Sequence, residues 1–444
     1  MKKPLLFFIL FFISISGFTQ STTLTVFDQI LFYDGYAGVV NQPVPNGVIR
    51  HRNDLYAKQL TASQLSSFGD ALTLNVSIKA DCDNYDRIGN VNLAFVPKNA
   101  TTYNPNLVPR IELGRFITPF MNKNLLPNTV PYTFNIDNIA KIFKDPGINA
   151  AYDIWIEFEV FGVPYSANTQ IQGCAGINSV FYGTLDIVSN TNSLTTSNNF
   201  LLPLNFKKNL NNYQAGASDA IGLSTRTIVF NLPTTMDNAY FYLITSNHGS
   251  NSGGEEYERR LHKVYFNNLL IPILNYTPGE LTCEPYRIYN TQGNGIYGPT
   301  PRSDIEWQSF SNWCPGAKIP LRKITLGALN SGNHTFRISI PNAVFFGGEG
   351  YFPISLYLQA SNAVLGLESV NKVEYSVFPN PTNECISIDT SDALKNVSIL
   401  NSLGQQVFQG NSKKIDISNF SNGVYFLHLQ FDNNIFVIEK IIKN

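Results

Sequence analysis

The chain has 444 residues, which is too long for one ordinary domain, so two or three domains are expected. Charged residues make up only 14% and the formal net charge is −1, which gives no electrostatic reason to expect nucleic acid or an anionic membrane as a partner. Neutral polar partners fit better. Aromatic residues make up 13%, a content that suits β-strands and also stacking against sugar rings.

The first twenty residues have the pattern of a signal peptide. Lys2 and Lys3 form a basic start, an apolar run follows over residues 5–15, and a small and polar region ends at Gln20. Because the apolar run is too short to span a bilayer comfortably, we expect it to be cleaved rather than to anchor the protein. The mature protein is therefore predicted to be secreted.

The rest of the chain predicts β-structure. Short alternating or apolar runs recur, as at 72–78, 227–232 and 351–358, and clusters of Asn, Gly, Pro and Ser separate them. One or two helical turns are expected near 138–143. The pattern is typical of β-sandwiches, so the fold class is predicted to be all-β.

Composition along the chain divides it into successive blocks. The signal peptide covers residues 1–20, and a first β-rich domain covers 21–195, ending in a polar stretch. A second β-rich domain covers 196–360. A linker at 361–371 leads to a compact block at 372–444, in which about seven short strands predict a small β-sandwich.

The last block has the most specific pattern in the chain. FPNP stands at 378–381, LGQ at 403–405, GVY at 423–425, and the chain ends on a basic segment at 440–443. This order resembles the C-terminal sorting domain of the type IX secretion system; the alternative is an ordinary β-sandwich module. The resemblance implies passage through the periplasm and across the outer membrane by the type IX machinery, with removal of this domain outside, leaving the protein released or attached to the cell surface.

Export makes the cysteines candidates for disulfides. Their pairing is not fixed by the residues alone, and an odd count leaves at least one thiol unpaired. A metal site is the rival interpretation, but neither CxxC nor HxxxH spacing occurs, so no metal site is predicted. The five cysteines are Cys82, Cys174, Cys283, Cys314 and Cys385.

Acidic residues are scarce enough for their clusters to be candidate sites. Asp81, Asp83 and Asp86 follow directly after an apolar strand, where carboxylates can be delivered into a cleft for acid–base chemistry. A calcium loop and a plain solvated loop are the alternatives, although the Gly and terminal Glu of an EF-hand are missing.

A second cluster follows His248 and contains Glu256, and its alternative is a charged turn with surface ion pairs. Glu157 is a third candidate, and it shares one strand face with Glu159.

The motifs of other catalytic classes are not found in the sequence. There is no GxSxG motif, no cysteine close to a histidine in sequence, and no glycine-rich loop of the kind that binds phosphates. Hydrolysis by water with the help of carboxylates is the chemistry that these residues support.

Three motifs resemble the peptide-N-glycosidase F family. CDNYDR at 82–87 is similar to its CDxxDR stretch, GRFITP at 114–119 to its GRFITP strand, and WCPG at 313–316 to its WCPG motif. Their order and spacing agree, and weaker similarity runs from about 24 to 358.

The resemblance implies two adjacent eight-stranded jelly-roll sandwiches with the site between them. It implies an amidase that hydrolyses the bond between N-acetylglucosamine and asparagine in N-glycosylated proteins or glycopeptides, giving a glycosylamine and aspartate. No metal and no cofactor are implied, and a monomer is expected.

The family's catalytic residues fall on Asp86, Glu256 and Glu157. Asp86 would activate water or polarise the amide, and Glu256 would hold water or sugar hydroxyls in line. The family's disulfide that ends in WCPG would be Cys283–Cys314, and Cys82 is left to pair with another cysteine, such as Cys174. The expected substrate-binding residues are Arg87, Tyr85, Trp313, Tyr257 and His248.

Departures from the family pattern leave a second hypothesis open. Two cysteines that flank the acidic-loop Glu in the family are here Gly254 and Glu258. The alternative is therefore a secreted, non-catalytic jelly-roll protein that binds glycans or proteins. A copper monooxygenase built on paired jelly rolls is disfavoured, because the chain has only five scattered His and three Met.

Overall fold

The computed structural model confirms the all-β class. The predicted signal peptide, the predicted boundary at 195 and most of the predicted linker at 361–371 lie outside the residues that the structure describes. The described residues are 21–190, 200–210, 224–250, 254–267, 269–345, 349–361, 366–367 and 372–444.

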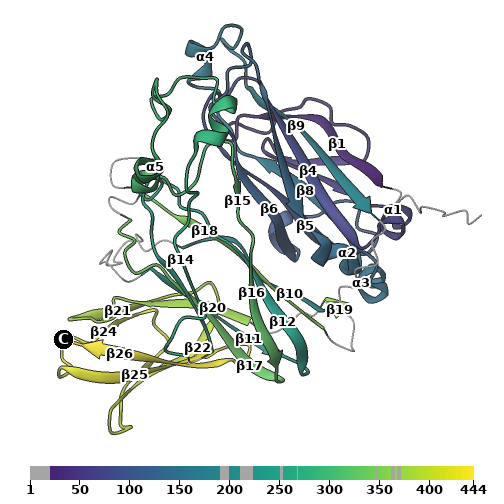
Figure 1. The fold of residues 1–444 in the computed structure, drawn as a ribbon. Helices are drawn as coiled ribbons and strands as arrows, with labels where there is room; N and C mark the ends of the chain where they lie inside the picture. Colours follow the sequence, from purple (N-terminus) through teal and green to yellow (C-terminus); the bar gives the residue numbers. More distant parts are fainter. Residues whose placement is uncertain are drawn as a thin grey trace, which may run out of the picture.

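The N-terminal domain is a sandwich of two antiparallel sheets (Figure 1). One sheet has the order β1 (Thr22–Tyr33), β9 (Ser179–Asn190), β4 (Ala71–Ala80) and β7 (Thr129–Asn135). The facing sheet has the order β15 (Lys318–Ile319), β6 (Arg110–Ile117), β5 (Ile88–Pro97), β8 (Tyr152–Val160), β3 (Leu55–Gln59) and β2 (Val48–Arg52). Alternation places every second residue of β4 in the core between the sheets, as Leu74 and Val76 show.

Short helices connect the strands of both domains. The turns expected near 138–143 are found as a 3-10 helix followed by α2, and α1 is fixed at its start by a capping box between Thr61 and Gln64. No described helix is long and apolar enough to cross a membrane. The helices are α1 (Ala62–Ser67), η1 (Pro105–Leu107), η2 (Asp137–Ile139), α2 (Ala140–Phe143), α3 (Pro146–Ala151), α4 (Ala167–Gln170), η3 (Glu284–Tyr289) and α5 (Asp304–Phe310).

The second domain is also a sandwich. One sheet has the order β16 (Arg322–Leu329), β12 (Met236–Ile244), β18 (Phe352–Ser361), β10 (Phe200–Leu210) and β19 (Gly366–Leu367). The facing sheet begins with β14 (Leu274–Tyr276), β13 (His262–Phe266), β17 (Gly332–Ser339) and β11 (Thr225–Leu232). Phe230, Phe241 and Phe336 fill the core between the sheets with edge-on ring contacts.

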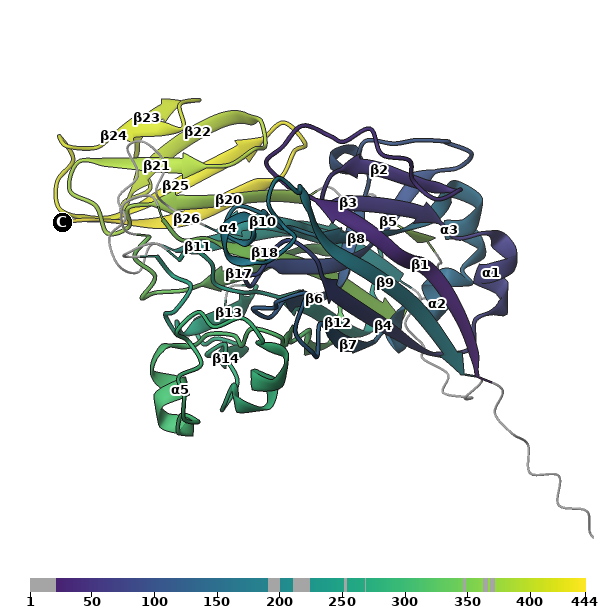
Figure 2. The same cartoon turned by 90° about the horizontal axis from the view of Figure 1, so that it is seen from above.

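The C-terminal block is a small sandwich of seven strands, but its first sheet is continuous with the second domain. β20 (Lys372–Phe378) pairs with β11, and the sheet continues through β21 (Cys385–Asp389) and β24 (Lys414–Asp416). The facing sheet has the order β23 (Gln406–Gly410), β22 (Leu394–Asn401), β25 (Gly423–Phe431) and β26 (Phe436–Lys443). Figures 1 and 2 show this block, in yellow, against the second domain.

Two features join the N-terminal domain to the second domain. β15, although it belongs to the second half of the sequence, adds to the edge of the N-terminal sheet by pairing with β6. Beside it, the fully buried Arg115 binds both carboxylate oxygens of Glu112 at 2.7 Å. Its Nη1 also donates to Ser246 Oγ and to the Pro353 carbonyl of the second domain, each at 2.8 Å. The domains are therefore held in one fixed relation, and this relation builds the site.

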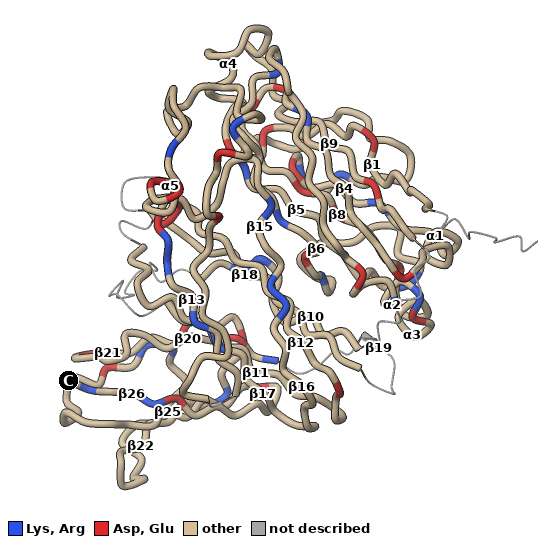
Figure 3. Tube along the Cα trace, in the orientation of Figure 1, with Lys and Arg blue, Asp and Glu red and all other residues tan. Residues whose placement is uncertain are grey.

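Charged side chains are few and are distributed over all three domains. Figure 3 shows Lys and Arg interspersed with Asp and Glu in all three domains. This distribution agrees with the net charge of −1 and with the expectation of neutral polar partners.

Candidate active site

The loop at 81–87 connects β4 to β5 and is organised around Asp83. Its carboxylate is fully buried and accepts hydrogen bonds from the backbone N–H groups of Tyr85 (2.9 Å) and Val163 (2.7 Å). Arg87 Nε donates to the same carboxylate at 2.7 Å and Nη2 at 3.3 Å. Burial raises the pKa of Asp83, and the Arg87 guanidinium opposes that rise. Asp83 therefore fixes the conformation of the loop that carries Tyr85, Asp86 and Arg87.

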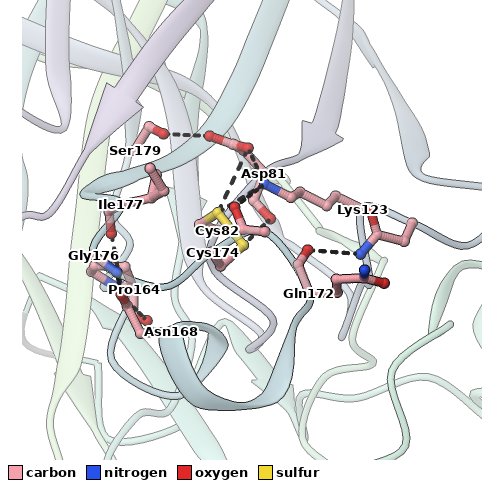
Figure 4. Close-up of a disulfide and its surroundings, with 12 residues drawn as sticks. Asp81, Cys82, Lys123, Pro164, Asn168, Gln172, Cys174, Gly176, Ile177 and Ser179 are labelled. Atoms are coloured by element: carbon pink, nitrogen blue, oxygen red, sulfur yellow. Dashed lines mark hydrogen bonds and ion pairs between the residues drawn. A yellow bond between two sulfur atoms is a disulfide. The ribbon is translucent and has the colours of Figure 1, made fainter.

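A disulfide anchors the start of this loop. Cys82 is bonded to Cys174, one of the two predicted pairings that the structure contains. Lys123 Nζ lies 3.3 Å from Asp81 Oδ1 and 3.2 Å from the carbonyl oxygen of Gly173, so it bridges the two sides of the disulfide (Figure 4). The bond ties the 81–87 loop to the segment around α4, which also reaches the pocket described below.

Replacing Cys82 and Cys174 together by Ser should lower the free energy of unfolding by about 2–4 kcal/mol, because the bond closes a long loop. The expected loss can be measured by denaturant unfolding of the variant beside the wild type. Cys385→Ser is the matched control, since Cys385 is the free cysteine of the described chain. An equal loss in both variants would show that the Cys82–Cys174 bond has no special role.

Asp86 is the carboxyl of this loop that has an oxygen without a hydrogen-bond partner among the described residues. This oxygen, Oδ2, is buried. Burial raises the pKa of Asp86 well above its usual range, the negative charge of Glu256 raises it further, and Arg87 opposes both. Such a carboxyl, with an unsatisfied oxygen, is the kind of group found at catalytic sites.

The GRFITP segment supports the Asp86 loop from below. Thr118 Oγ1 accepts a hydrogen bond from the backbone N–H of Arg87 at 2.7 Å, and Thr118 N–H donates to the Arg87 carbonyl at 2.8 Å. Two residues on, Phe120 contacts the Tyr85 ring edge-on, with 5.7 Å between ring centroids. The motif therefore continues from the interdomain Arg115 to the floor of the site.

The second-domain acidic loop turns two neighbouring glutamates in opposite directions. Glu255 is fully buried and binds Arg260, with 2.6 Å between Oε2 and Nε. The backbone N–H of Glu256 donates to the Gly249 carbonyl at 3.1 Å, and its side chain lies at the pocket. Gly249 has φ of +109°, and a Cβ there would lie 2.6 Å from the backbone of Gly350, so this close approach requires glycine.

Asp86 and Glu256, from different domains, line one pocket of about 370 Å³. Burial raises the pKa of Glu256 as well, while a hydrogen bond with the Tyr257 side chain lowers it. The predicted residues Tyr85, Arg87 and Tyr257 line the same pocket. The remaining lining residues are Asn84, Phe120, Gln170, Ser250, Gln292, Gly293, Asn294 and Ile296.

Glu157 does not belong to this pocket, which corrects the prediction that three carboxylates meet. It pairs across the sheet with Asn92, about 13 Å along β5 from the strand end next to Asp86. Its fully buried carboxylate is held by Tyr103 Oη (3.0 Å), Arg110 Nη1 (3.2 Å) and Asn92 Nδ2 (3.3 Å). Glu157 shares a strand face with Glu159, but protein covers this face at Glu157, and its carboxylate is bound by neighbouring side chains.

Trp313 and His248 are also absent from the pocket lining. Trp313 is only 7% exposed, packs with Ile117 and Ile244 between the domains, and donates from Nε1 to the Asn247 carbonyl at 2.8 Å. It lines a separate, smaller cavity of about 140 Å³ and not the pocket of Asp86 and Glu256. His248 is buried beside Arg115, its Nε2 lies 2.7 Å from Ser246 Oγ, and burial lowers its pKa to about 3. Neither residue lines the pocket of Asp86 and Glu256.

The WCPG motif lies beside the GRFITP segment. The predicted disulfide Cys283–Cys314 is present, and Gly316 N–H donates to the Ile117 carbonyl at 3.1 Å. Asn290 Nδ2 donates to the Pro315 carbonyl at 3.0 Å, while its Oδ1 accepts from Phe120 N–H at 2.9 Å. WCPG and GRFITP therefore pack against each other and hold Phe120 and the 292–296 segment at the pocket.

Several pocket residues were not predicted. Asn84 and Phe120 stand inside or directly after the recognised motifs, so the motifs could have indicated them. Gln170 ends α4, Gln292 and Asn294 lie in a polar loop, and none of the three stands in a distinguishing pattern. Only the fold brings these three beside Asp86.

Two further observations bear on the choice of site. A larger cavity of about 1090 Å³ lies on the N-terminal domain near α1 and α3, but it is far from the paired carboxyls and none of the predicted site residues line it. Within the described ranges, no group of three His, Cys, Asp or Glu is arranged to hold a metal ion. The chemistry is best sought in the smaller pocket between the domains.

The paired sandwiches and the interdomain pocket define a class of two-domain jelly-roll protein, and sequence families agree. The N-terminal region of peptide-N-glycosidase F matches residues 23–174 and its C-terminal region matches 217–359. These matches span more than half of the chain, which belongs to the peptide-N-glycosidase F family. The secretion system C-terminal sorting domain matches residues 376–444 and indicates type IX export to the cell surface or beyond. A comparison with curated proteins finds no match.

Solved structures share the fold at low identity. PNGF-II in its P21 crystal form is similar with a TM-score of 0.54 and 22% identity, over 77% of this chain and 65% of that one. Its C2 form gives 0.54 and 20%, over 78% and 66%. A peptide-N(4)-(N-acetyl-β-D-glucosaminyl) asparagine amidase gives 0.50 and 18%, over 80% and 99%. The chain therefore spans about two thirds of the length of PNGF-II.

Proposed function

We propose that the chain is a secreted amidase that cleaves the bond between N-acetylglucosamine and asparagine in N-glycosylated proteins or glycopeptides. The observation that supports this most directly is the convergence of Asp86 and Glu256, from two domains, on one pocket. An oxygen of Asp86 is buried there without a partner. Membership of the peptide-N-glycosidase F family agrees with this proposal.

Asp86 is the proposed general base. A carboxylate with a raised pKa is a stronger base than an ordinary one, and burial beside Glu256 raises the pKa of Asp86. It would take a proton from water as the oxygen adds to the side-chain carbonyl carbon of the glycosylated Asn. Breaking the C–N bond, with return of the proton to nitrogen, then yields a glycosylamine and leaves Asp in the protein.

The other pocket residues have roles that their chemistry supports. Arg87 is held in place by Asp83, and its cationic group stands beside Asp86, where it would stabilise negative charge on the carbonyl oxygen. Glu256 would position water and accept hydrogen bonds from sugar hydroxyls. Tyr85 and Tyr257 are 38% and 37% exposed and offer aromatic faces to a sugar ring.

The test uses the mature protein and a denatured N-glycoprotein. Release of the glycan with conversion of Asn to Asp, read by mass spectrometry of the peptide, supports the amidase. Binding of glycopeptide without cleavage, over a range of pH and substrates, would instead establish the non-catalytic binding protein.

The pH profile should reveal the coupling between the two carboxyls. Because the charge of Glu256 raises the pKa of Asp86, Glu256→Gln should lower that pKa. The base then stays ionised to lower pH, so the acid limb of kcat/KM moves to lower pH while kcat falls by about 10²-fold. Glu258→Gln, two residues away and exposed, is the control and should leave the limb unmoved. A limb that stays in place in Glu256→Gln would contradict the assignment of Asp86 as the base.

A further inference from the structure

The sorting domain is docked on the second domain as an extra part of its sheet. β20 runs antiparallel to β11, with Thr227 opposite Tyr375 and Phe230 opposite Lys372. On its other side β11 pairs with β17, so β11 is an edge strand of the second domain that the tail converts into a central one. Figures 1 and 2 show the tail packed against the second domain.

Buried charge reinforces the strand pairing. Arg226, at the start of β11, has a side chain that is only 3% exposed and lies against two tail carboxylates. Its Nε is 3.2 Å from Glu374 Oε1, and its Nη1 is 3.0 Å from Asp389 Oδ2. Lys208 Nζ of β10 adds a second contact with Glu374 at 3.2 Å. The cationic side chains of the second domain therefore lie opposite carboxylates of the tail.

The tail also has a cationic side chain that contacts the second domain. Lys372 Nζ donates to the backbone carbonyls of Pro203 (3.1 Å) and Leu204 (2.6 Å) in β10. These carbonyls belong to the second domain, so the tail also satisfies acceptors there.

The apolar packing crosses the same boundary. Val229 of β11 is 5% exposed and belongs to the core of the tail, together with Val373, Tyr375 and Ile388. The core of the tail is therefore completed by a residue of the second domain. Separation of the two would expose this apolar surface, open the edge of β11 and leave Arg226 without its partners.

We propose that the edge of β11, with Arg226 and Lys208 beside it, is a docking site for a β-strand that is flanked by carboxylates, and that its occupant is the tail of the same chain. A cut between the second domain and β20 then leaves the tail bound non-covalently. Export would produce a two-piece protein in which the sorting domain remains a subunit, independently of whether the pocket has amidase activity.

The test uses the full chain with a specific protease site placed between Leu367 and Lys372. After complete cutting, size-exclusion chromatography at physiological salt should give one peak that contains both pieces. Two peaks, with the tail eluting as a separate small protein, would overturn the proposal.

A charge reversal identifies the contact that holds the pieces together. Arg226→Glu faces Glu374 and Asp389 with a like charge, and the dissociation constant of the cut tail should rise by about 100-fold or more. Lys263→Glu on β13, in the same sheet but two strands from β11, is the matched control and should retain the tail.

The reciprocal variant guards against simple misfolding. Arg226→Glu and Lys208→Glu combined with Glu374→Arg and Asp389→Arg reverse both sides of the contact and restore opposite charges, so co-elution should return. Release of the tail from the restored variant, or its retention by Arg226→Glu alone, would show that these ion pairs do not hold the tail.

Discussion

Asp86→Asn should lower the kcat of glycopeptide hydrolysis by about 10³-fold or more, with glycopeptide binding retained. The substitution keeps the size of the side chain and removes the proton acceptor, and general bases contribute about 10²–10⁴-fold to such reactions. Single-turnover release of glycan and equilibrium binding of a labelled glycopeptide, measured separately, check the two halves of the expectation.

The same substitution should make the protein more stable at neutral and alkaline pH. The folded-state pKa of Asp86 is raised, so as the pH rises past the unfolded-state pKa the unfolded chain ionises first, and stability falls until the folded-state pKa is passed. Asn removes that cost and should raise the stability by about 1 kcal/mol, or Tm by roughly 2–4 °C. The gain should vanish at acidic pH, where Asp86 is protonated in both states.

Glu157→Gln is the control for this prediction. Glu157 is a buried carboxyl of the same domain but is bound by Tyr103 and Arg110 away from the pocket. Its replacement should reduce stability and leave the kcat of the folded protein close to that of the wild type. A loss of kcat as large as that of Asp86→Asn would return Glu157 to the catalytic group.

Arg115→Met should destabilise the protein by about 3–5 kcal/mol, because it leaves the carboxylate of Glu112 buried without its cation. The Ser246 and Pro353 contacts across the domain boundary are lost at the same time. Thermal unfolding should show a Tm lower by about 10 °C. Activity should fall by more than the loss of folded protein explains, because the relative position of Asp86 and Glu256 depends on this domain boundary.

A double variant separates charge from packing. Adding Glu112→Leu to Arg115→Met removes both members of the buried pair, and much of the stability should return. Activity should remain low, since the hydrogen bonds to the second domain are still missing. If Arg115→Met alone were as stable and active as the wild type, Arg115 would not be the residue that fixes the domains.

The fold class was predictable from the sequence pattern itself, whereas the two disulfide pairings that the structure contains were indicated only by the family resemblance. Alternation in segments such as β4 reflects a core on one face, and it is visible without any partner strand. The pairing of β20 with β11 was not predictable in this way. It depends on which strand edges remain open after two sandwiches have folded, and nothing in residues 372–378 alone reveals that.

The site residues that stand in recognised motifs could be predicted. Whether a predicted residue reaches the pocket depends on what covers it, which the sequence does not reveal. Asp86, Arg87 and Glu256 do line one pocket, whereas Glu157, His248 and Trp313 do not. Strand alternation indicated only that Glu157 and Glu159 share one face of β8, and protein covers that face at Glu157. Conversely, the sequence does not distinguish Asp83 from Asp86 as a candidate site residue. Only the hydrogen bonds of Asp83 show that it organises the loop.

β15 comes from the second half of the chain but pairs with the N-terminal sheet, and this limits how the protein can be divided into fragments. A gene divided between residues 190 and 200 would strip the N-terminal piece of an edge strand and leave Arg115 facing water. The remaining piece would carry Lys318–Ile319 with no sheet to join. Neither fragment would have a complete N-terminal sheet, so the two halves need to be produced as one chain.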